Sequence, residues 1–364
     1  MKSNKIARVI ALYLPQYHPI PENDEWWGKG FTEWTNVGRA KPFFKGHYQP
    51  KVPADLGYYD LRLPQIREAQ AEMAKEAGIE GFCYYHYWFD TNKQLLERPF
   101  NEVLESGSPD FPFMLCWANE SWHAKLWNVE GVSEKKILIE QKYGTQDDQT
   151  IHFNHLLKAF KDRRYIKIDG KPAFMIYKPL EIPEVKKMLN LWQILAKENG
   201  LPGIFFIGSS QSAENQKDQI FNLGFDAVNA VRLFDILKGN KTFFKAIKKL
   251  YRLIYKMPHR FEYAKVQKTF ISEQDSEEFV FPTIIPNWDH TPRSGKNGYV
   301  LTGSEPMFFE KHLENCFSTI KNKNNEHKIV FLKSWNEWGE GNYVEPDLKY
   351  GKSYLMVLKK MLCV

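Results

Sequence analysis

Short apolar runs separated by helix-like segments constrain the fold of this chain more than any other feature. Most runs lack the polar alternation of a half-exposed strand, so they fit parallel strands that are buried on both faces. Eight runs are predicted as strands, at residues 8–14, 78–85, 113–117, 173–177, 204–208, 227–231, 279–285 and 329–334. Helices are predicted between them, for example over 63–77 and over 183–199, where Gly200 ends the helix. Eight such alternations predict an α/β fold of the (β/α)8 TIM-barrel type.

A doubly wound sheet is the alternative for a chain of this pattern. If it bound a dinucleotide, it would need a glycine-rich phosphate turn after an early strand. The first predicted strand is followed instead by Pro15-Gln16-Tyr17-His18-Pro19, which is a rigid polar loop. The 364 residues are 43% apolar, which is enough for one large core. We therefore expect a single barrel domain over 1–364.

Two connections are longer than a barrel requires. Residues 18–60 form a loop rich in Trp, Gly and Pro, and loops of this length are usually functional. Residues 232–278 include a basic amphipathic segment, 241–260. This segment fits a solvated helix that covers the barrel, or a peripheral contact with an anionic membrane surface or lipid-linked glycan.

Charge and cysteine usage limit the partners and the compartment. The net charge is +6, but acidic and basic residues are mixed along the chain, so no nucleic acid partner is expected. The four cysteines show neither a disulfide framework nor a zinc spacing, which favours a reducing compartment. The apolar run after Arg8 is too short for a signal peptide, and no window is long enough to span a bilayer. We expect a cytoplasmic protein without a cofactor.

The segment that follows the last predicted strand, 334–341, carries two carboxylates three residues apart between tryptophans. Cleavage of a glycosidic bond usually needs two carboxyl groups beside one linkage. Residues at this spacing face the same side only in a helical turn, and Gly339 and Gly341 make such a turn easy. Glu337 and Glu340 are therefore the predicted catalytic pair. The alternative is that they cap a helix or pair with surface lysines.

Other polar and aromatic residues follow the predicted strands or lie in the first long loop. In a barrel such residues meet at one rim, and aromatic rings there can stack on sugars. The predicted substrate-binding residues are Gln16, Tyr17, His18, Trp34, His86, Tyr87, Trp88, Trp117, Asn119, Glu120, Trp288, Asp289, Arg293, Asn336, Trp338 and Glu345. Alternatives stay open: Asn119 and Glu120 can begin a helix, Trp117 can be loop packing, and His86 can be a satisfied core histidine. No metal site is expected, since His152 and His155 have no carboxylate beside them.

Several motifs together resemble the glycoside hydrolase family 99-like group, of the WbsX type. They are Ala11-Leu12-Tyr13-Leu14-Pro15-Gln16-Tyr17-His18, Gly30-Phe31-Thr32-Glu33-Trp34, Tyr84-Tyr85-His86-Tyr87-Trp88, Trp117-Ala118-Asn119-Glu120, and Trp335-Asn336-Glu337-Trp338-Gly339-Glu340-Gly341 with Glu345-Pro346. The resemblance covers nearly the whole chain and implies a retaining (β/α)8 enzyme related to endo-α-mannosidases. It implies that Glu337 deprotonates the sugar 2-hydroxyl, whose oxygen attacks the anomeric carbon, and that Glu340 is the acid and then the base. Gly339 stands where the mannosidase motif has His, and Asn342 and Tyr343 stand for its Thr and Gln, so mannose specificity does not follow.

Three functions are consistent with the sequence. The first is a glycosidase that acts on a bacterial polysaccharide or oligosaccharide. The second is a glycosyltransferase or transglycosylase in the biosynthesis of a surface polysaccharide such as O-antigen or capsule; a metal-dependent transferase would want an Asp-x-Asp motif, which the sequence lacks. The third is a non-catalytic glycan-binding barrel, which is expected to lose a carboxylate, whereas both are present.

Overall fold

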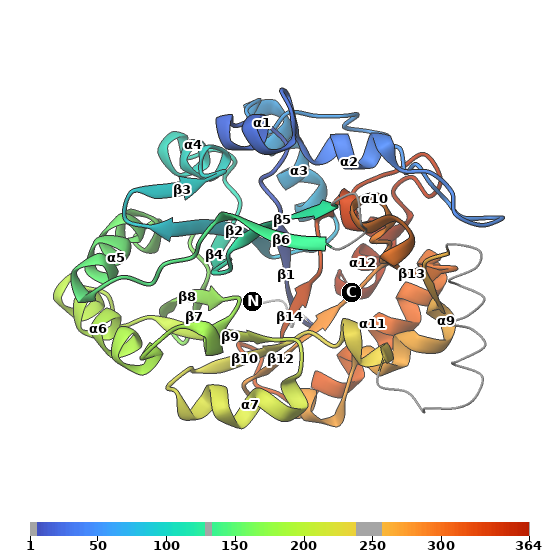
Figure 1. Ribbon diagram of the computed structural model, residues 1–364. Helices are drawn as coiled ribbons and strands as arrows, with labels where there is room; N and C mark the ends of the chain where they lie inside the picture. The colour runs from blue at the N-terminus through green and yellow to red at the C-terminus, as the bar shows by residue number, and fades with distance from the viewer. Residues whose placement is uncertain (1–5, 128–132, 238–256, 364) are drawn as a thin grey trace.

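The structure, a computed structural model, confirms the predicted barrel and describes residues 6–127, 133–237 and 257–363. Each predicted apolar run supplies one parallel strand of its wall (Figure 1): β1 (Arg8–Tyr13), β2 (Gly81–Asp90), β4 (Phe113–Trp117), β8 (Lys171–Ile176), β9 (Phe205–Ser210), β10 (Ala227–Ala230), β12 (Val280–Ile284) and β14 (Ile329–Leu332). Each strand pairs with the next in this order. The last strand, β14, pairs with β1, so the sheet closes.

Burial on both faces explains why these strands read as continuous apolar runs. Residues from Val9 to Tyr13 in β1, and all of β14, are at most 4% exposed. Their inner faces fill the barrel, and their outer faces pack against the surrounding helices. One hydrophobic cluster includes residues from Ala7 to Leu362, and on this basis we propose that the chain forms one domain.

Helices surround the strands in the manner of a barrel (Figure 1). The longer ones are α3 (Pro64–Glu76), α4 (Arg98–Ser106), α5 (Gln146–Phe160), α6 (Val185–Glu198), α7 (Ala213–Asn222), α11 (Pro306–Ile320) and α12 (Ser353–Leu362). The predicted helices over 63–77 and 183–199 correspond to α3 and α6. Gly200 has a φ of 79°, a left-handed conformation that stops α6 where the sequence indicated.

The first long connection, 18–60, contains two short helices, α1 (Pro21–Trp27) and α2 (Glu33–Arg39). Helix α2 contacts the 3-10 turn η6 (Trp338–Glu340), which follows β14 at the carboxyl end of the barrel. It also contacts the short helix α10 (Thr291–Ser294), which follows β12. This connection therefore forms part of the rim on which the predicted site lies.

The second long connection, 232–278, is described only in part. Its described residues include β11 (His259–Glu262), which pairs with β13 (Tyr299–Thr302), and α9 (Tyr263–Val266). Most of the expected amphipathic segment 241–260 lies outside the described residues. Four further strands extend other connections: β3 (Lys93–Leu95) pairs with β2, β5 (Trp122–Trp127) with β6 (Ser133–Ile139), and β7 (Lys167–Ile168) with β8. Every helix among the described residues is too short or too polar to cross a lipid bilayer.

Candidate active site

The chain beyond β14 forms the turn that the sequence predicted. The two-residue strands β15 (Asn336–Glu337) and β16 (Asn342–Tyr343) pair with each other, and η6 lies between them. This turn brings Glu337 and Glu340 together, and the charge of Glu340 is one cause of the raised pKa of Glu337. Gly341 has a φ of 54°, and a Cβ there would lie 2.6 Å from Lys51 Nζ, so both conformation and space require glycine.

Buried polar contacts fix this turn to the end of β1. The Asn336 side chain accepts a hydrogen bond from the Leu14 amide at 2.8 Å and donates to the Leu14 carbonyl at 3.0 Å. The Tyr17 hydroxyl donates to the Asn336 carbonyl and accepts from the Trp338 amide. Asn336 and Tyr17 were predicted to bind substrate, but the structure places both inside the support of the turn.

Glu345 and Trp338 lie in the same support. The Trp338 ring stacks on Tyr343, with centroids 3.7 Å apart, and its Nε1 donates to Glu345 Oε2 at 2.6 Å. Glu345 also accepts hydrogen bonds from Tyr59 Oη at 2.8 Å and from Gln70 Nε2 at 2.6 Å. Burial raises the pKa of Glu345 to about 7. Three protein donors therefore hold this carboxyl group beneath the turn.

Two cations flank the carboxylate pair. Lys333 Nζ lies 3.3 Å from Glu337 Oε2, and Arg293 Nη1 lies 2.6 Å from Glu340 Oε1. His290 Nε2 is 3.6 Å from the same Glu340 oxygen. The side chains of Glu337 and Glu340 are 7% and 15% exposed, so the second is the more accessible of the two.

The surroundings shift the pKa values of the two carboxyl groups in opposite directions. Burial raises the pKa of Glu337 to about 7; the Lys333 charge opposes this effect and the Glu340 charge adds to it. Burial also acts on Glu340, but Arg293, His290 and Lys333 outweigh it and hold the pKa of Glu340 well below 4.5. Two adjacent carboxyl groups with such different affinities for a proton are typical of acid–base sites.

Tyrosines from β2 and from the connection after β8 face the pair. Tyr85 and Tyr87 lie in β2 and Tyr177 follows β8; the Glu337 charge raises the pKa of each hydroxyl, although burial is the largest cause. Glu120 follows β4, its side chain is 48% exposed, and burial raises its pKa. The Lys178 amine lies 3.9 Å from Glu120, and together these groups form a polar wall that could hydrogen-bond sugar hydroxyls.

Asn119, beside Glu120, is occupied by the protein itself. Its Nδ2 donates to the Lys178 carbonyl at 2.9 Å, and its Oδ1 accepts from the Lys178 amide at 2.8 Å. Asn119 is fully buried. The structure therefore places it as a link between the connections after β4 and β8.

His86, Trp88 and Trp117 lie away from the carboxylate pair, against α5. Trp88 stacks on His152, with centroids 4.4 Å apart, and His86 Nε2 lies 2.9 Å from His152 Nε2. Trp117 Nε1 donates to the Trp88 carbonyl at 2.9 Å. Burial lowers the pKa of His86 to about 3 and keeps the ring neutral. Successive side chains of a strand point to opposite faces, so His86 and Trp88 face outward whereas Tyr85 and Tyr87 face the pair.

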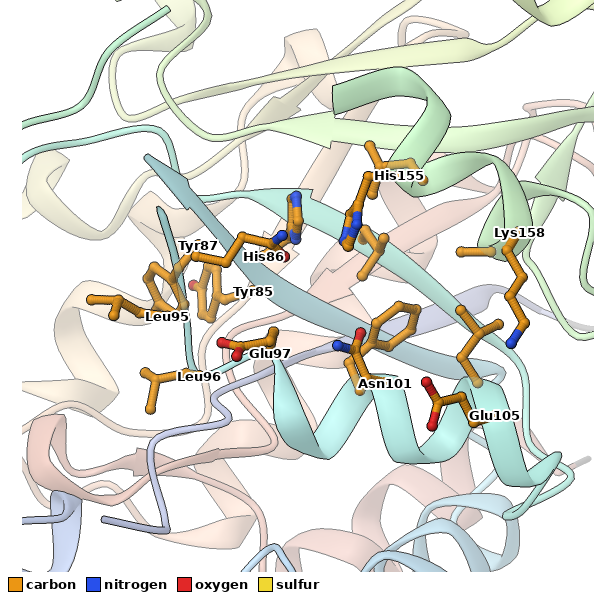
Figure 2. Close-up of a pocket in the computed structure, with 16 residues that line it drawn as sticks. Tyr85, His86, Tyr87, Leu95, Leu96, Glu97, Asn101, Glu105, His155 and Lys158 are labelled. Atoms are coloured by element: carbon orange, nitrogen blue, oxygen red, sulfur yellow. The ribbon is translucent and has the colours of Figure 1, made fainter. Parts of the chain in front are cut away.

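A cavity of about 210 Å³ lies beside His86, between β2, β3, α4 and α5. Figure 2 shows the residues that line it. His86, Asn101 and His155 are among its lining residues, and Glu337 and Glu340 are not. A second cavity, of about 100 Å³, is lined by His47, Lys51 and Asp289 behind the turn. Both cavities therefore lie beside the candidate site rather than around it.

Asp289 anchors the turn from the side of β12. Its amide donates to the Glu340 carbonyl at 2.7 Å, and its Oδ2 accepts from His47 Nε2 and Gln49 Nε2, both at 2.7 Å. Its Oδ1 accepts from the Thr291 hydroxyl at 2.6 Å, which fixes the start of α10. These contacts make Asp289 a support for the loop that carries Arg293.

The remaining predicted residues are placed around the turn. Trp288 lies under the Lys333 amine, 5.6 Å from ring centroid to nitrogen. Trp34 packs against Trp338 at 5.6 Å and is partly exposed. His18 is buried, and burial lowers its pKa, while the Gln16 carbonyl accepts a hydrogen bond from the Glu33 amide.

Glu33 and Lys333 are charged residues beside the carboxylate pair that were absent from the predicted set. Glu33 Oε1 accepts from Arg293 Nε at 2.9 Å, and Lys333 contacts Glu337. The signal for Glu33 was its place in the Gly-Phe-Thr-Glu-Trp motif of the first long connection, whereas Lys333 had only its position at the end of a strand. Among the described residues, no group of three or more His, Cys, Asp or Glu is arranged to hold a metal ion.

Comparison with known proteins relates this geometry to a family. Residues 9–358 match the family described as Glycosyltransferase WbsX. Two curated relatives named WxcX, from two strains of Xanthomonas campestris pv. campestris, are 34% identical over 359 residues, or 98% of the chain. The chain spans about half the length of these relatives.

Solved structures share the fold. A GH99 endo-alpha-mannosidase from Bacteroides thetaiotaomicron, in complex with BIS-TRIS-propane, has a TM-score of 0.57 at 13% identity and covers 97% of this chain and 96% of its own. A glycoside hydrolase-like protein has a TM-score of 0.60 at 16% identity, with coverage of 100% and 95%. At such identities the likeness concerns the fold.

Proposed function

The chain belongs to the WbsX glycosyltransferase family, and from this premise we propose that it is a glycan-processing enzyme, a glycoside hydrolase that acts on a bacterial polysaccharide or oligosaccharide. One observation carries the proposal: the turn after β14 brings Glu337 and Glu340 together between Lys333 and Arg293, and their pKa values are shifted in opposite directions. The same end of the strands carries the active site in barrel enzymes.

In the proposed mechanism Glu337 takes the proton of the sugar 2-hydroxyl, and the freed oxygen attacks the anomeric carbon. Glu340 gives its proton to the departing glycosidic oxygen, which leaves a 1,2-anhydro sugar. Water then opens this ring at the anomeric carbon, gives a proton to Glu340, and Glu337 returns its proton to the 2-oxygen. Two inversions give net retention without a covalent glycosyl-enzyme, unlike the usual retaining scheme. A pKa of about 7 for Glu337 suits a base that works near neutral pH.

Transfer to a sugar hydroxyl is the second candidate, since the family is described as a glycosyltransferase. The same carboxylates can serve both reactions, with an acceptor hydroxyl in place of water in the second step. Product analysis with and without added acceptor oligosaccharide separates the two. A role in surface polysaccharide biosynthesis and a cytoplasmic location stay predictions.

Aryl glycosides and oligosaccharides of manno, gluco and rhamno configuration provide the test. Glu340→Gln is expected to lower kcat on oligosaccharides by about a hundredfold or more, with a smaller loss on activated aryl glycosides, because their leaving groups need little protonation. Glu337→Gln should lose activity on both kinds of substrate.

The exposed Glu198, at the end of α6, provides the matched control, and Glu198→Gln should retain full activity. Circular dichroism and the unfolding midpoint establish that each variant is folded. Near wild-type rates in folded Glu337→Gln or Glu340→Gln, on every substrate that the wild type cleaves, would exclude the proposed pair.

A further inference from the structure

Gly339, between the two carboxylates, is a glycine for reasons of space. A Cβ placed on it would overlap with Glu33 Oε1, and would lie 2.6 Å from Glu33 Cδ and 3.2 Å from Arg293 Nε. Its φ lies outside the left-handed region, so the backbone conformation alone would accept another residue. The Glu33 carboxylate therefore occupies the position in which any other side chain at 339 would begin.

Glu33 reaches this position from a distant part of the sequence. It is the first residue of α2, and its amide donates to the Gln16 carbonyl at 3.0 Å. Thr35 Oγ1 accepts from the Thr32 amide at 3.3 Å, which fixes the beginning of the helix. The Glu33 side chain is 1% exposed, so its negative charge needs a cation inside the protein.

Arg293 supplies that cation and shares it with the proposed acid. Its Nε donates to Glu33 Oε1 at 2.9 Å, while Nη1 donates to Glu340 Oε1 at 2.6 Å. A guanidinium is planar, so a bond to Nε fixes the direction in which Nη1 points. Lysine, with a single nitrogen, cannot reproduce this pair of bonds. On the other side of the carboxylate pair, Lys333 Nζ lies 3.3 Å from Glu337 Oε2.

We propose that Glu33 is a positioning residue of the candidate site, which acts through Arg293 to fix the direction of the Glu340 carboxylate, and that Gly339 leaves the space which Glu33 fills. The catalytic part rests on the proposed function. The packing part does not, because it concerns only the fit of Glu33 against residue 339.

A double-mutant cycle in unfolding by urea tests the packing part without any substrate. Gly339→Ala is expected to lower the folding equilibrium constant by about ten- to a hundredfold in the wild-type background, as overpacking does. In the Glu33→Ala background the same change should cost less than about threefold, because the clashing carboxylate is absent. Gly38→Ala, a glycine in α2 with open space around its Cβ, is the control and should cost little in either background.

Equal losses from Gly339→Ala in both backgrounds would overturn the packing part. If Gly339→Ala does not fold, recovery of folded protein in the double variant supports the proposal. A double variant that also fails to fold counts against the proposal.

Kinetics of Glu33→Gln test the positioning part, since this change keeps the shape and removes the charge. The expected result is a fall in kcat of about ten- to a hundredfold with KM within about threefold. The acidic limb of the pH profile should move to lower pH, because loss of a nearby negative charge lowers the pKa of the remaining carboxyls. Unchanged kcat and an unchanged profile would overturn it. If Glu337→Gln and Glu340→Gln stay active, the proposed function fails instead, and the packing cycle remains a valid test of Glu33.

Discussion

The buried carboxyl group of Glu345 leads to a stability prediction that requires no substrate. Burial raises its pKa from 4.5 in the unfolded chain to about 7 in the folded protein. The folded state therefore binds this proton more tightly than the unfolded state, and the stabilisation is complete below about pH 4.5 and is lost as the pH rises to about 7. The difference of about 2.5 between the two pKa values, at 1.36 kcal/mol per unit, predicts a loss of about 3 kcal/mol in the free energy of unfolding.

Glu345→Gln is the perturbation that isolates this effect. Glutamine keeps the length and shape of the side chain and does not ionise, so the variant should lack this part of the pH dependence. Urea unfolding of both proteins at intervals from pH 4.5 to 8 gives the difference between their free energies. That difference should change by about 3 kcal/mol in favour of the variant as the pH rises. Other groups, such as Glu337, titrate in both proteins, so their contributions cancel in the difference between the two free energies.

A constant offset between the free energies of unfolding of the two proteins would only report the altered hydrogen bonds of the amide. The control Glu198→Gln should follow the wild type throughout. Parallel curves for wild type and Glu345→Gln would refute the reasoning, because they would mean that Glu345 is ionised in the folded state at every pH tested.

Two further stability predictions follow from paired charges away from the site. Burial lowers the pKa of His327, but hydrogen bonds to Asp169 and Glu278 outweigh it and leave the pKa above 6.5. This stabilisation is complete below about pH 6.5 and disappears as the pH rises through the folded-state pKa. His327→Gln should therefore lose less stability than the wild type as the pH rises, and equal losses in the two proteins would contradict this prediction. Arg232 Nη1 contacts both oxygens of the buried Asp275 at 2.7 Å, and Arg232→Met should cost about 3–5 kcal/mol in urea unfolding. Adding Asp275→Asn should restore much of that loss, because no unpaired charge then remains, and a double variant as unstable as the single one would rule this out.

The sequence predicted the fold because strands buried on both faces must be apolar throughout. Every predicted run supplied a barrel strand, but the boundaries of β2 differ: it begins at Gly81 and ends at Asp90, whereas the prediction was 78–85. At its start, Gly78 has a φ of 82° and belongs to the turn after α3. At its end, pairing with the antiparallel strand β3 extends β2. A short polar segment such as 93–95 has no apolar pattern from which β3 could be predicted.

This boundary also explains why part of the site could not be predicted. If the strand had ended at Tyr85, the residues after it could have turned toward the rim together. Because β2 continues, the side chains alternate, and His86 and Trp88 pack under α5 while Tyr87 faces Glu337. Glu33 was missed for a different reason: its role depends on an approach to Gly339 across the fold, and nothing in the spacing of the two residues indicates it.

The charges of the site suggest how the proposed mechanism begins. Burial raises the pKa of Glu337 to about 7 and the cations around Glu340 hold its pKa well below 4.5, whereas the first step of the proposed mechanism needs a deprotonated Glu337 and a protonated Glu340. In the proposed mechanism one proton must therefore pass from Glu337 to Glu340 before the first step. After that transfer Lys333 balances the charge of Glu337, but Arg293 loses its partner at Glu340 and keeps only Glu33. Without Glu33, Arg293 would be left unpaired in the reactive state. Removal of Glu33 should therefore change kcat more than KM.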